Sequence, residues 1–403
     1  MKQKGNYGRG RSYKGGGRNT GYGNRNRRGG GRRGRKERID PNKYVAEAQV
    51  NVEESMYVTD KSYAEFELLP VLSQNLAKKR YVHPTKVQSQ AIPEVLAGRD
   101  ILALASTGSG KTGAFLIPLI NNSIKDKTQK TLIVVPTREL ANQIKNEFDL
   151  FALNAGLKRV LVIGGQNIHR QAASIRENPQ FIIGTPGRLK DLCGRGDLKL
   201  GQFNNVVLDE VDRMLDMGFI GDIKELIALL NPVRQSLFLS ATMTPAAETI
   251  ARDLLKEPVR ITAGTQSPIK NVEQKVIRIV KGQNKIDTLV ELLERREFVK
   301  VLVFSETKRN CDLLTRELVK RGIKVATIHG NKSQNVRTRM LASFRKNDIQ
   351  VLVATDVASR GIDVPDITHV INYDEPNTYD DYIHRIGRTG RIGKRGVALT
   401  FVG

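Results

Sequence analysis

The chain has 403 residues, which is long enough for two or three domains with their own cores. It carries 66 Lys and Arg against 42 Asp and Glu, and this formal net charge of +24 predicts a polyanionic partner such as nucleic acid. Its apolar stretches fall far short of the ~18 residues that a membrane span needs, and no apolar region follows the basic start, so neither a membrane protein nor a secretory signal peptide is expected.

The first 36 residues form a head of unusual composition. They hold 13 Lys and Arg, 12 Gly and no acidic residue, and no Ile, Leu, Val or Phe occurs before Ile39. Such a segment cannot bury apolar surface and is expected to be disordered. Tyr7, Tyr13 and Tyr22 among Arg-Gly steps favour stacking and phosphate contacts with flexible nucleic acid, although a solubilising tail has a similar composition. Residues 37–62 are polar and mixed, and we expect them to form a linker or extended arm.

Apolar runs then alternate with helical patterns, as is typical of parallel α/β sheets. We expect a first domain at 63–262, an interdomain linker at 263–272, where small and polar residues break the pattern, and a second domain at 273–403. The predicted strands of the first domain are 100–105, 131–135, 159–163, 181–183, 204–208 and 235–239, and those of the second are 300–304, 324–328, 349–353, 369–372 and 396–402.

A phosphate-binding loop follows the first of these strands. Residues 105–112 are Ala-Ser-Thr-Gly-Ser-Gly-Lys-Thr, in which the two glycines allow a tight turn that points backbone N–H groups at phosphate oxygens. Lys111 would hold the β- and γ-phosphates, and Thr112 would bind Mg²⁺. The residues predicted to bind the nucleotide here are Ser106, Thr107, Gly108, Ser109, Gly110, Lys111 and Thr112.

An acidic pair ends a second strand about a hundred residues later. The apolar run 205–208 delivers Asp209 to the strand's carboxyl end, where ligands of open α/β sheets gather. Asp209 is predicted to reach the metal, partly through water, and Glu210 to act as the base or positioner for the attacking water. The pattern therefore predicts hydrolysis of a nucleoside triphosphate on magnesium.

The second domain has no phosphate loop of its own. One loop shared by two α/β sheets implies a site in the cleft between them, which the second domain completes with cations. Residues 384–391, His-Arg-Ile-Gly-Arg-Thr-Gly-Arg, place three arginines at intervals of three and suit this role.

These motifs and their order resemble the DEAD-box family of ATP-dependent RNA helicases, within helicase superfamily 2. The resemblance covers residues 63–403, with Asp-Glu-Val-Asp at 209–212 in place of the family's Asp-Glu-Ala-Asp. It implies two tandem RecA-like parallel-sheet domains with a nucleotide cleft between them, ATP and Mg²⁺ as cofactors, and RNA as a largely sequence-independent partner. Ribonucleoprotein complexes are further possible partners, and nothing points to an obligate oligomer.

The resemblance also implies roles for individual residues. Gln88 would read the adenine edge, and Tyr63, or Phe66 in its place, would pack on the adenine ring. Arg80 stands where the family usually has glycine, and Ser359 stands where alanine is common. By resemblance, the residues that contact RNA are Pro136, Thr137, Arg138, Gly164, Gly165, Thr185, Pro186, Gly187, Arg188, Gln334, Arg337, Thr355 and Asp356.

The remaining roles implied by the resemblance concern catalysis and coupling. Gly361 and Asp363 would approach the ribose and phosphates of ATP, and Arg388 and Arg391 would be arginine fingers. The residues that couple ATP state to strand separation would be Ser240, Thr242 and His384. Family members usually continue with a helix after the last strand, and a chain that ends at Gly403 would lack it.

Three other functions remain compatible with parts of the sequence. A DNA-directed superfamily 2 helicase shares the ATPase motifs, although the Gln88 motif and residues 384–391 argue against it. A passive RNA-binding or annealing clamp would rely on the head. A degenerate ATPase that serves as a scaffold is disfavoured by the intact set of ATP-site residues.

Cys193 and Cys311 lie 118 positions apart, without the spacing of a metal site. We expect reduced thiols, a reducing compartment and a cytoplasmic location.

Overall fold

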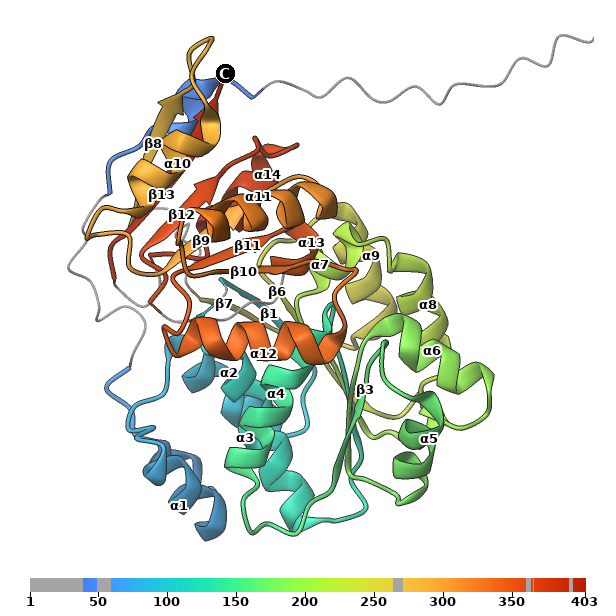
Figure 1. Ribbon diagram of the computed structural model, residues 1–403. Coiled ribbons are helices and arrows are strands. Elements are labelled where there is room, and N and C mark those ends of the chain that lie inside the picture. Colours follow the sequence, from blue (N-terminus) through green and yellow to red (C-terminus); the bar gives the residue numbers. More distant parts are fainter. Residues whose placement is uncertain are drawn as a thin grey trace, which may run out of the picture. The chain divides into compact units, whose positions relative to one another are not determined.

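The computed structural model describes residues 39–48, 59–106, 108–263, 271–359, 364, 366–390 and 394–403, apart from the side chains of Val357 and Asp380. The head, most of the predicted interdomain linker, Thr107, Gly361, Asp363 and Arg391 lie outside these residues. The described residues form two parallel β-sheets, each flanked by helices (Figure 1). We call the units built on them the first and second lobes.

The first sheet has the strand order β3-β4-β2-β5-β6-β1-β7 in the described chain, and every pairing in it is parallel. Its strands β2, β4 and β5 are buried along their whole length, as expected for a sheet covered on both faces. The strands are β1 (Ile101–Ala105), β2 (Thr131–Val134), β3 (Arg159–Val162), β4 (Phe181–Gly184), β5 (Asn205–Leu208), β6 (Gln235–Ser240) and β7 (Val259–Ala263).

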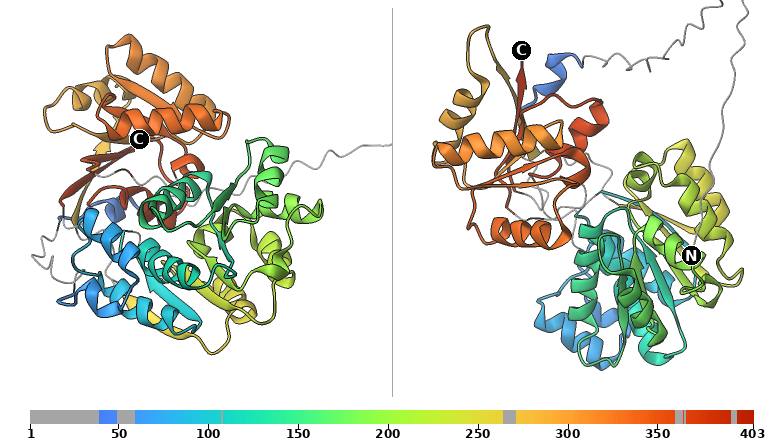
Figure 2. Two further views of the ribbon diagram at one scale, coloured as in Figure 1. Left: turned by 90° about the horizontal axis from the view of Figure 1, so that it is seen from below. Right: turned by 45° about the vertical axis from the view of Figure 1, so that its right-hand side comes forward.

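Two apolar cores cover the two faces of this sheet. One joins it to α1–α4, and the other joins it to α5–α9. Figure 2 shows helices on both sides of the strands in two further views. The helices are η3 (Tyr63–Phe66), α1 (Pro70–Lys78), α2 (Lys86–Leu96), α3 (Lys111–Lys125), α4 (Arg138–Phe151), α5 (Ile168–Arg176), α6 (Pro186–Gly194), η4 (Leu200–Gln202), α7 (Val211–Asp216), α8 (Ile220–Ala228) and α9 (Pro245–Leu254).

The second sheet has the order β10-β11-β9-β12-β13-β8 in the described chain and is also parallel. Its strands are β8 (Val272–Arg278), β9 (Val301–Phe304), β10 (Val325–Ile328), β11 (Val351–Ala354), β12 (His369–Asn372) and β13 (Gly396–Val402). Its helices are α10 (Lys285–Leu293), α11 (Lys308–Lys320), α12 (Gln334–Arg345), α13 (Asp356–Ser359) and α14 (Tyr379–Ile386), and the short helix η1 (Pro41–Tyr44) comes from the arm.

The predicted strands are confirmed, with ends that differ by one or two residues. The sequence did not reveal β7 and β8, which lie at the outer edges of the two sheets. Both carry polar residues on one face or at one end, since Arg260 and Thr262 in β7 and Glu273 and Lys275 in β8 interrupt the apolar pattern. An edge strand has one side open to solvent, so it tolerates such polar residues, although the edge strands β3 and β10 keep apolar runs and were predicted.

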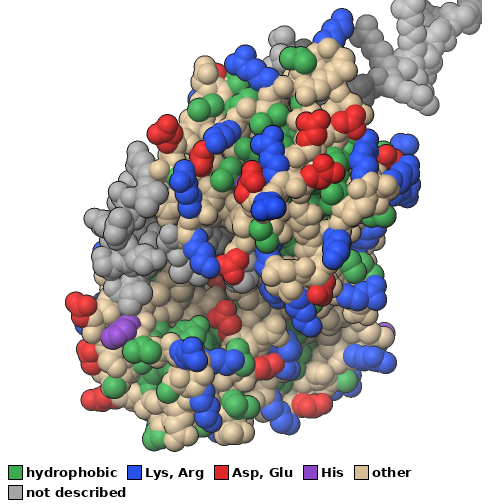
Figure 3. All heavy atoms as spheres, turned by 60° about the vertical axis from the view of Figure 1, so that its left-hand side comes forward, with side chains coloured by type: hydrophobic (Ala, Val, Ile, Leu, Met, Phe, Trp, Pro, Cys, Tyr) green, Lys and Arg blue, Asp and Glu red, His purple; other side chains and the backbone are tan. Residues whose placement is uncertain are grey.

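The described surface carries both signs of charge. On the face shown in Figure 3, Lys and Arg side chains intermingle with Asp and Glu. Residues 37–403 hold 53 basic and 42 acidic residues, so more than half of the net positive charge belongs to the head. No helix in the described ranges is both long and apolar enough to cross a membrane.

Candidate functional site: a nucleotide loop beside a strip of polar loops

The phosphate loop lies between β1 and α3, as predicted. Gly108 and Gly110 have φ of +85° and +92°, a conformation that a side chain would strain, and Gly110 is the N-cap of α3. The helix therefore begins at Lys111 with its N-terminus at the loop, where N–H groups and the helix dipole favour anions. Nζ of Lys111 is buried and donates to the carbonyl of Ala105 at 2.7 Å, so the ammonium group is held over the end of β1.

Asp209 and Glu210 follow β5, which neighbours β6, and β6 neighbours β1. Both side chains are buried, and the carboxylate of Asp209 accepts from the N–H of Glu210 at 2.9 Å. Glu210 has φ of +55° at the start of α7, which is costly for a residue with a side chain. Nη1 of Arg213 donates to its carboxylate at 2.6 Å. The sheet order thus brings the predicted base and the predicted metal ligand to the same carboxyl end of the sheet as the phosphate loop. We call this region the nucleotide edge.

Burial sets the electrostatics of this edge. It raises the pKa of Asp209 to about 7, helped by the charge of Glu210 and opposed by Lys111. A divalent cation bound here would favour the carboxylate form. The hydroxyl of Ser109 in the phosphate loop is buried and has no hydrogen-bond partner among the described residues, so the loop presents a polar group suited to a phosphate oxygen.

The donors at this edge fit magnesium bound together with a nucleotide. Thr112 and Asp209 supply hard oxygen ligands, and Mg²⁺ is commonly held by one or two such groups plus substrate phosphates. The described residues contain no cluster of three or more His, Cys, Asp or Glu that would hold a metal without the nucleotide.

Asp212 joins this edge to the strand end that carries Ser240 and Thr242. Its Oδ2 accepts from the N–H groups of Ala241 and Thr242, each at 3.0 Å, and from the hydroxyl of Thr242 at 3.2 Å. The hydroxyl of Ser240 accepts from the N–H of Asp212 at 3.3 Å. A displacement of α7 would therefore be transmitted directly to the loop after β6.

Gln88 contacts the phosphate loop from α2. Its Oε1 accepts from the N–H of Thr85 at 2.9 Å and from the hydroxyl of Tyr63 at 2.6 Å, and its Nε2 donates to the carbonyl of Gly110 at 3.0 Å. Tyr63 and Phe66 are both buried, with ring centroids 5.9 Å apart. Tyr63 thus contacts Gln88 directly, and Phe66 supports Tyr63.

The three polar loops predicted to contact RNA from the first lobe follow β2, β3 and β4. These strands are neighbours in the order β3-β4-β2, so the loops form a continuous strip at one edge of the sheet. The guanidinium of Arg138 lies over Gly164 and Gly165, so close that a Cβ on Gly165 would collide with Nη1. The two glycines therefore leave room for this cation.

The rest of the strip comes from the loop after β4. Thr185 and Pro186 begin α6, and Gly187 leaves open space where a side chain would stand. Arg188 donates to the carbonyl of Gln166 at 3.0 Å and to the side chain of Gln171 at 3.1 Å. Thr137 caps α4 by accepting from the N–H of Leu140 at 3.2 Å, which fixes the loop that begins at Pro136. The strip thus combines backbone, hydroxyl and cationic groups suited to phosphates.

In the second lobe, Thr355 and Asp356 follow β11. The carboxylate of Asp356 accepts two hydrogen bonds from Arg385, at 2.6 and 2.8 Å, and Arg385 also donates to Asn372 and to the carbonyl of Asp374. Arg385 is almost fully buried. It fixes α14 to the strand ends of the second sheet.

Gln334 and Arg337 lie at the start of α12 and contact Glu139 of α4. Nε2 of Gln334 donates to Oε1 of Glu139 at 3.1 Å, and Nη2 of Arg337 lies 3.0 Å from the same oxygen. All three side chains are buried. Their contact with RNA stays a prediction, and the structure adds a direct contact with the first turn of α4, which also holds Arg138.

His384 is half-buried on α14, and Arg388 is buried just after this helix. Burial lowers the pKa of His384, and the cations Arg213 and Arg388 lower it further, while Asp212 and Asp216 oppose them. The lowered pKa favours the neutral imidazole, which lies within electrostatic range of Asp212 and Asp216 on α7 of the first lobe. The predicted roles of Thr107, Gly361, Asp363 and Arg391 fall outside the described residues.

Two arginines of the site were not singled out from the sequence. Arg213 lies three residues after Glu210, a spacing that places two side chains on one face of a helix and could have indicated the ion pair. Arg385 belongs to the motif at 384–391, whose arginines are predicted to point at phosphates, but its guanidinium donates to Asp356, to Asn372 and to the carbonyl of Asp374. Only the fold shows that Arg385 forms an ion pair with the carboxylate of Asp356.

Comparisons with known proteins agree with this geometry. Residues 85–250 match the DEAD/DEAH box helicase family, and residues 284–393 match the helicase conserved C-terminal domain. The ATP-dependent RNA helicase CshA of Limosilactobacillus reuteri is 40% identical over 343 residues, which are 84% of this chain and 69% of that protein. The DEAD-box ATP-dependent RNA helicase 30 of Arabidopsis thaliana is 42% identical over 81% of this chain, but the match spans only 56% of that protein.

Solved structures give the same result. S. cerevisiae Dbp5 bound to RNA and ADP BeF3 matches 85% of this chain and 89% of its own, with a TM-score of 0.73 and 29% identity. A double-deletion form of Mss116p bound to ssRNA and AMP-PNP matches 85% of this chain and 75% of its own, with a TM-score of 0.76 and 29% identity. The two RecA-like lobes, the phosphate loop and the order of the site residues show that the chain belongs to the DEAD-box ATP-dependent RNA helicase family.

Proposed function

We propose that this chain is an RNA-stimulated ATPase that unwinds short RNA duplexes, or remodels RNA–protein complexes, by ATP-driven closure of its two lobes on RNA. The observation that carries the proposal is the sheet order of the first lobe. Loops after β3, β4 and β2 form the polar strip, while loops after β5, β6 and β1 form the nucleotide edge. The carboxyl ends of the strands of one sheet would thus bind both the nucleotide and RNA. A shift of the loops that bind one ligand would therefore move the neighbouring loops that bind the other.

The nucleotide edge divides its tasks among few residues. Lys111 and the N–H groups of the loop would hold phosphates, and Thr112 and Asp209 would hold Mg²⁺, which neutralises charge on the phosphate oxygens when it is bound. Glu210 would orient and deprotonate the attacking water. Gln88, which already contacts Gly110 and Tyr63, would report the presence of adenine to the loop.

The second lobe would complete the site upon closure. Arg388, with Arg391, would stabilise the charge that develops on the transferred phosphoryl group, an effect worth about 10³–10⁵ in rate in enzymes that use such arginines. Hydrolysis would then depend on the closed arrangement, and its products would release the RNA. We assign the lobes to residues 63–262 and 273–403, joined by residues 263–272.

The strip would contact phosphates and 2′-hydroxyls and would not read base edges, so binding should be largely independent of sequence. The basic head would add affinity for RNA without fixing a register. A reducing, cytoplasmic compartment suits the two cysteines, both of which are free thiols.

Separation of a short RNA duplex, assayed with the full chain and with Lys111→Ala, tests this function. Lys111 is buried against the phosphate loop, so its loss should abolish ATP-dependent strand separation while passive annealing by the head continues. Strand separation that needs no ATP and is unchanged in Lys111→Ala would instead favour a passive clamp.

A further inference from the structure

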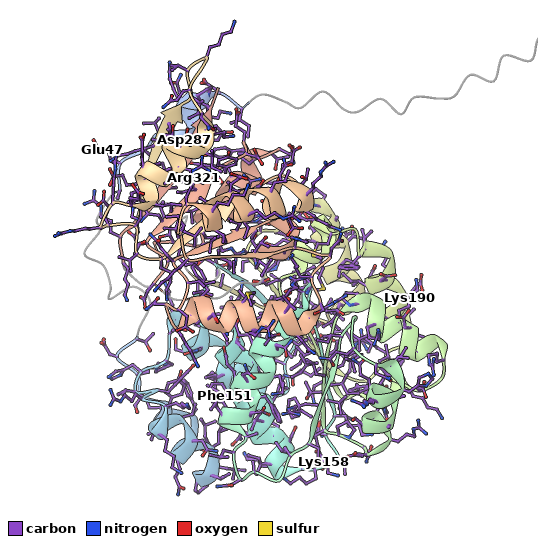
Figure 4. The ribbon with its side chains drawn as sticks, in the orientation of Figure 1. Glu47, Phe151, Lys158, Lys190, Asp287 and Arg321 are labelled. Carbon is purple, nitrogen blue, oxygen red and sulfur yellow. The ribbon has the colours of Figure 1, made fainter. Side chains whose placement is uncertain are left out.

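The arm before the first lobe packs on the second lobe. Residues 39–48 lie beside β8 and β13 in Figures 1 and 2. Ala46 forms an antiparallel bridge with Gln274 of β8, with N–H to carbonyl distances of 3.2 and 2.7 Å. In Figure 4, Glu47 lies with Asp287 and Arg321 of the second lobe and apart from Phe151 and Lys158 of the first. The arm therefore extends the outer edge of the second sheet, although it precedes the first lobe in sequence.

Tyr44 anchors this arm. It ends the short helix η1, which starts at Pro41 after Asp40 accepts a hydrogen bond from the N–H of Asn42. Its side chain is fully buried in a cluster with Val272, Tyr382, Ile386 and Ala398, and its ring centroid is 4.7 Å from that of Tyr382. A tyrosine in a linker without a fixed position would be exposed to solvent. Tyr44 is fully buried, so it belongs to the apolar core of the second lobe.

The residues beneath Tyr44 carry the cationic segment of the site. Tyr382 and Ile386 belong to α14, which also carries His384 and Arg385 and leads into Arg388. The hydroxyl of Tyr382 donates to Oε1 of Gln274 at 2.8 Å, so the arm's bridge partner also holds this helix. Tyr44 thus packs against the face of α14 that carries Tyr382 and Ile386, in the same helix as His384 and Arg385.

A second path leads from Tyr44 to the turn after Arg388. Gly390, at φ of +67°, lies so close to Val272 that a Cβ there would meet the valine methyl group at 2.6 Å. Val272 itself belongs to the cluster of Tyr44. Removing the tyrosine ring would leave a cavity beside Val272, and this turn packs directly on that valine.

We propose that Tyr44 is a positioning residue for the arginine-bearing segment 384–390, and that the arm is a working part of the second half of the ATPase site. This inference rests on the proposed function, in which Arg388 acts on the transferred phosphoryl group. Tyr44 touches no reacting group and acts through α14 and Val272. The contact required is the ring alone, because the hydroxyl of Tyr44 is buried without a hydrogen-bond partner among the described residues.

The test compares Tyr44→Ala with Tyr44→Phe in RNA-stimulated ATP hydrolysis by the full chain. Tyr44→Ala should lower kcat at least tenfold and change KM for ATP less than threefold, because the phosphate loop lies in the other lobe. Tyr44→Phe should restore kcat. Leu318→Ala, which cuts a fully buried side chain in a separate core of the second lobe, is the matched control and should keep kcat per folded molecule.

Ala46→Pro provides a variant that leaves the cluster intact. It removes the N–H that donates to the carbonyl of Gln274 and should lower kcat in the same direction. Hydrogen exchange of residues 379–390 gives a readout that needs no activity, and it should be faster in Tyr44→Ala and Ala46→Pro than in Leu318→Ala.

Wild-type kcat in both Tyr44→Ala and Ala46→Pro, or unchanged exchange across residues 379–390, would overturn the proposal. A wild-type chain without RNA-stimulated hydrolysis would refute the proposed function instead, and the exchange measurement would still decide whether the arm orders this segment.

Discussion

Arg213 donates a hydrogen bond of 2.6 Å to the carboxylate of Glu210, and the two side chains are only 5% and 10% exposed. Glu210 holds a left-handed backbone conformation at the end of β5, where strain persists only if the surroundings enforce it. The ion pair is one such constraint, because it fixes the carboxylate while the first turn of α7 fixes the backbone. The proposed base is thus held in place before any ligand binds.

Arg213→Gln is expected to destabilise the first lobe. It leaves a buried carboxylate without its cation, and breaking a buried ion pair by removing one partner costs about 3–5 kcal/mol. In a Glu210→Gln background the same change should cost much less, because no charge is left uncompensated. Urea unfolding of the two single variants and the double variant measures this coupling, and additive losses would show that the pair does not hold Glu210.

Arg80→Gly is expected to stabilise the chain by about 1 kcal/mol, because glycine adopts the left-handed conformation without the strain imposed by a side chain. Arg80 has φ of +58° just after α1, where its N–H donates to the carbonyl of Ala77 and that of Tyr81 donates to Leu76. This hydrogen-bond pattern ends many helices and favours glycine. Thermal unfolding of Arg80→Gly beside Arg80→Ala tests it, and an equal gain in both would point to the loss of the arginine side chain instead.

Stability should fall as pH drops from about 6.5 toward 4, and His369 should contribute to that fall. Its ring stacks on that of Phe298, with the two ring centroids 3.8 Å apart, and burial lowers the pKa of His369 to about 4. Between these values the unfolded chain binds a proton that the folded chain does not, whereas above pH 6.5 the group contributes no pH dependence. His369→Gln should therefore flatten the decline in unfolding free energy between pH 6.5 and 4. The exposed His169→Gln is the control, and equal slopes in the two variants would refute this role.

Deleting residues 1–36 should weaken RNA binding and flatten its dependence on salt, while maximal ATP turnover stays nearly intact. The head holds 13 basic residues, and each phosphate contact that it makes releases counterions. RNA affinity measured across a salt series, for the full and shortened chains, checks this. An unchanged salt slope would mean that the core alone provides the electrostatic contacts.

Central strands and their terminal loops were predictable because buried parallel strands leave continuous apolar runs. Asp209, Lys111 and Gly164 could be placed at strand ends for this reason. The strands β7 and β8 were not, since polar residues such as Glu273 and Lys275 interrupt their apolar pattern, whereas the edge strands β3 and β10 keep short apolar runs that could be recognised. The burial of Tyr44 was also invisible, because a single aromatic residue in a polar segment has no periodicity. Its partners on β8 and α14 lie more than 200 positions away.

ATP hydrolysis by the full chain with single-stranded RNA, with matched single-stranded DNA and without nucleic acid, beside Glu210→Gln, tests the central claim most directly. An RNA-stimulated ATPase with Glu210 as its base predicts strong stimulation by RNA, little by DNA, and loss of turnover in Glu210→Gln while the variant still binds RNA in the presence of ATP. Equal stimulation by DNA, or hydrolysis indifferent to RNA, would contradict it.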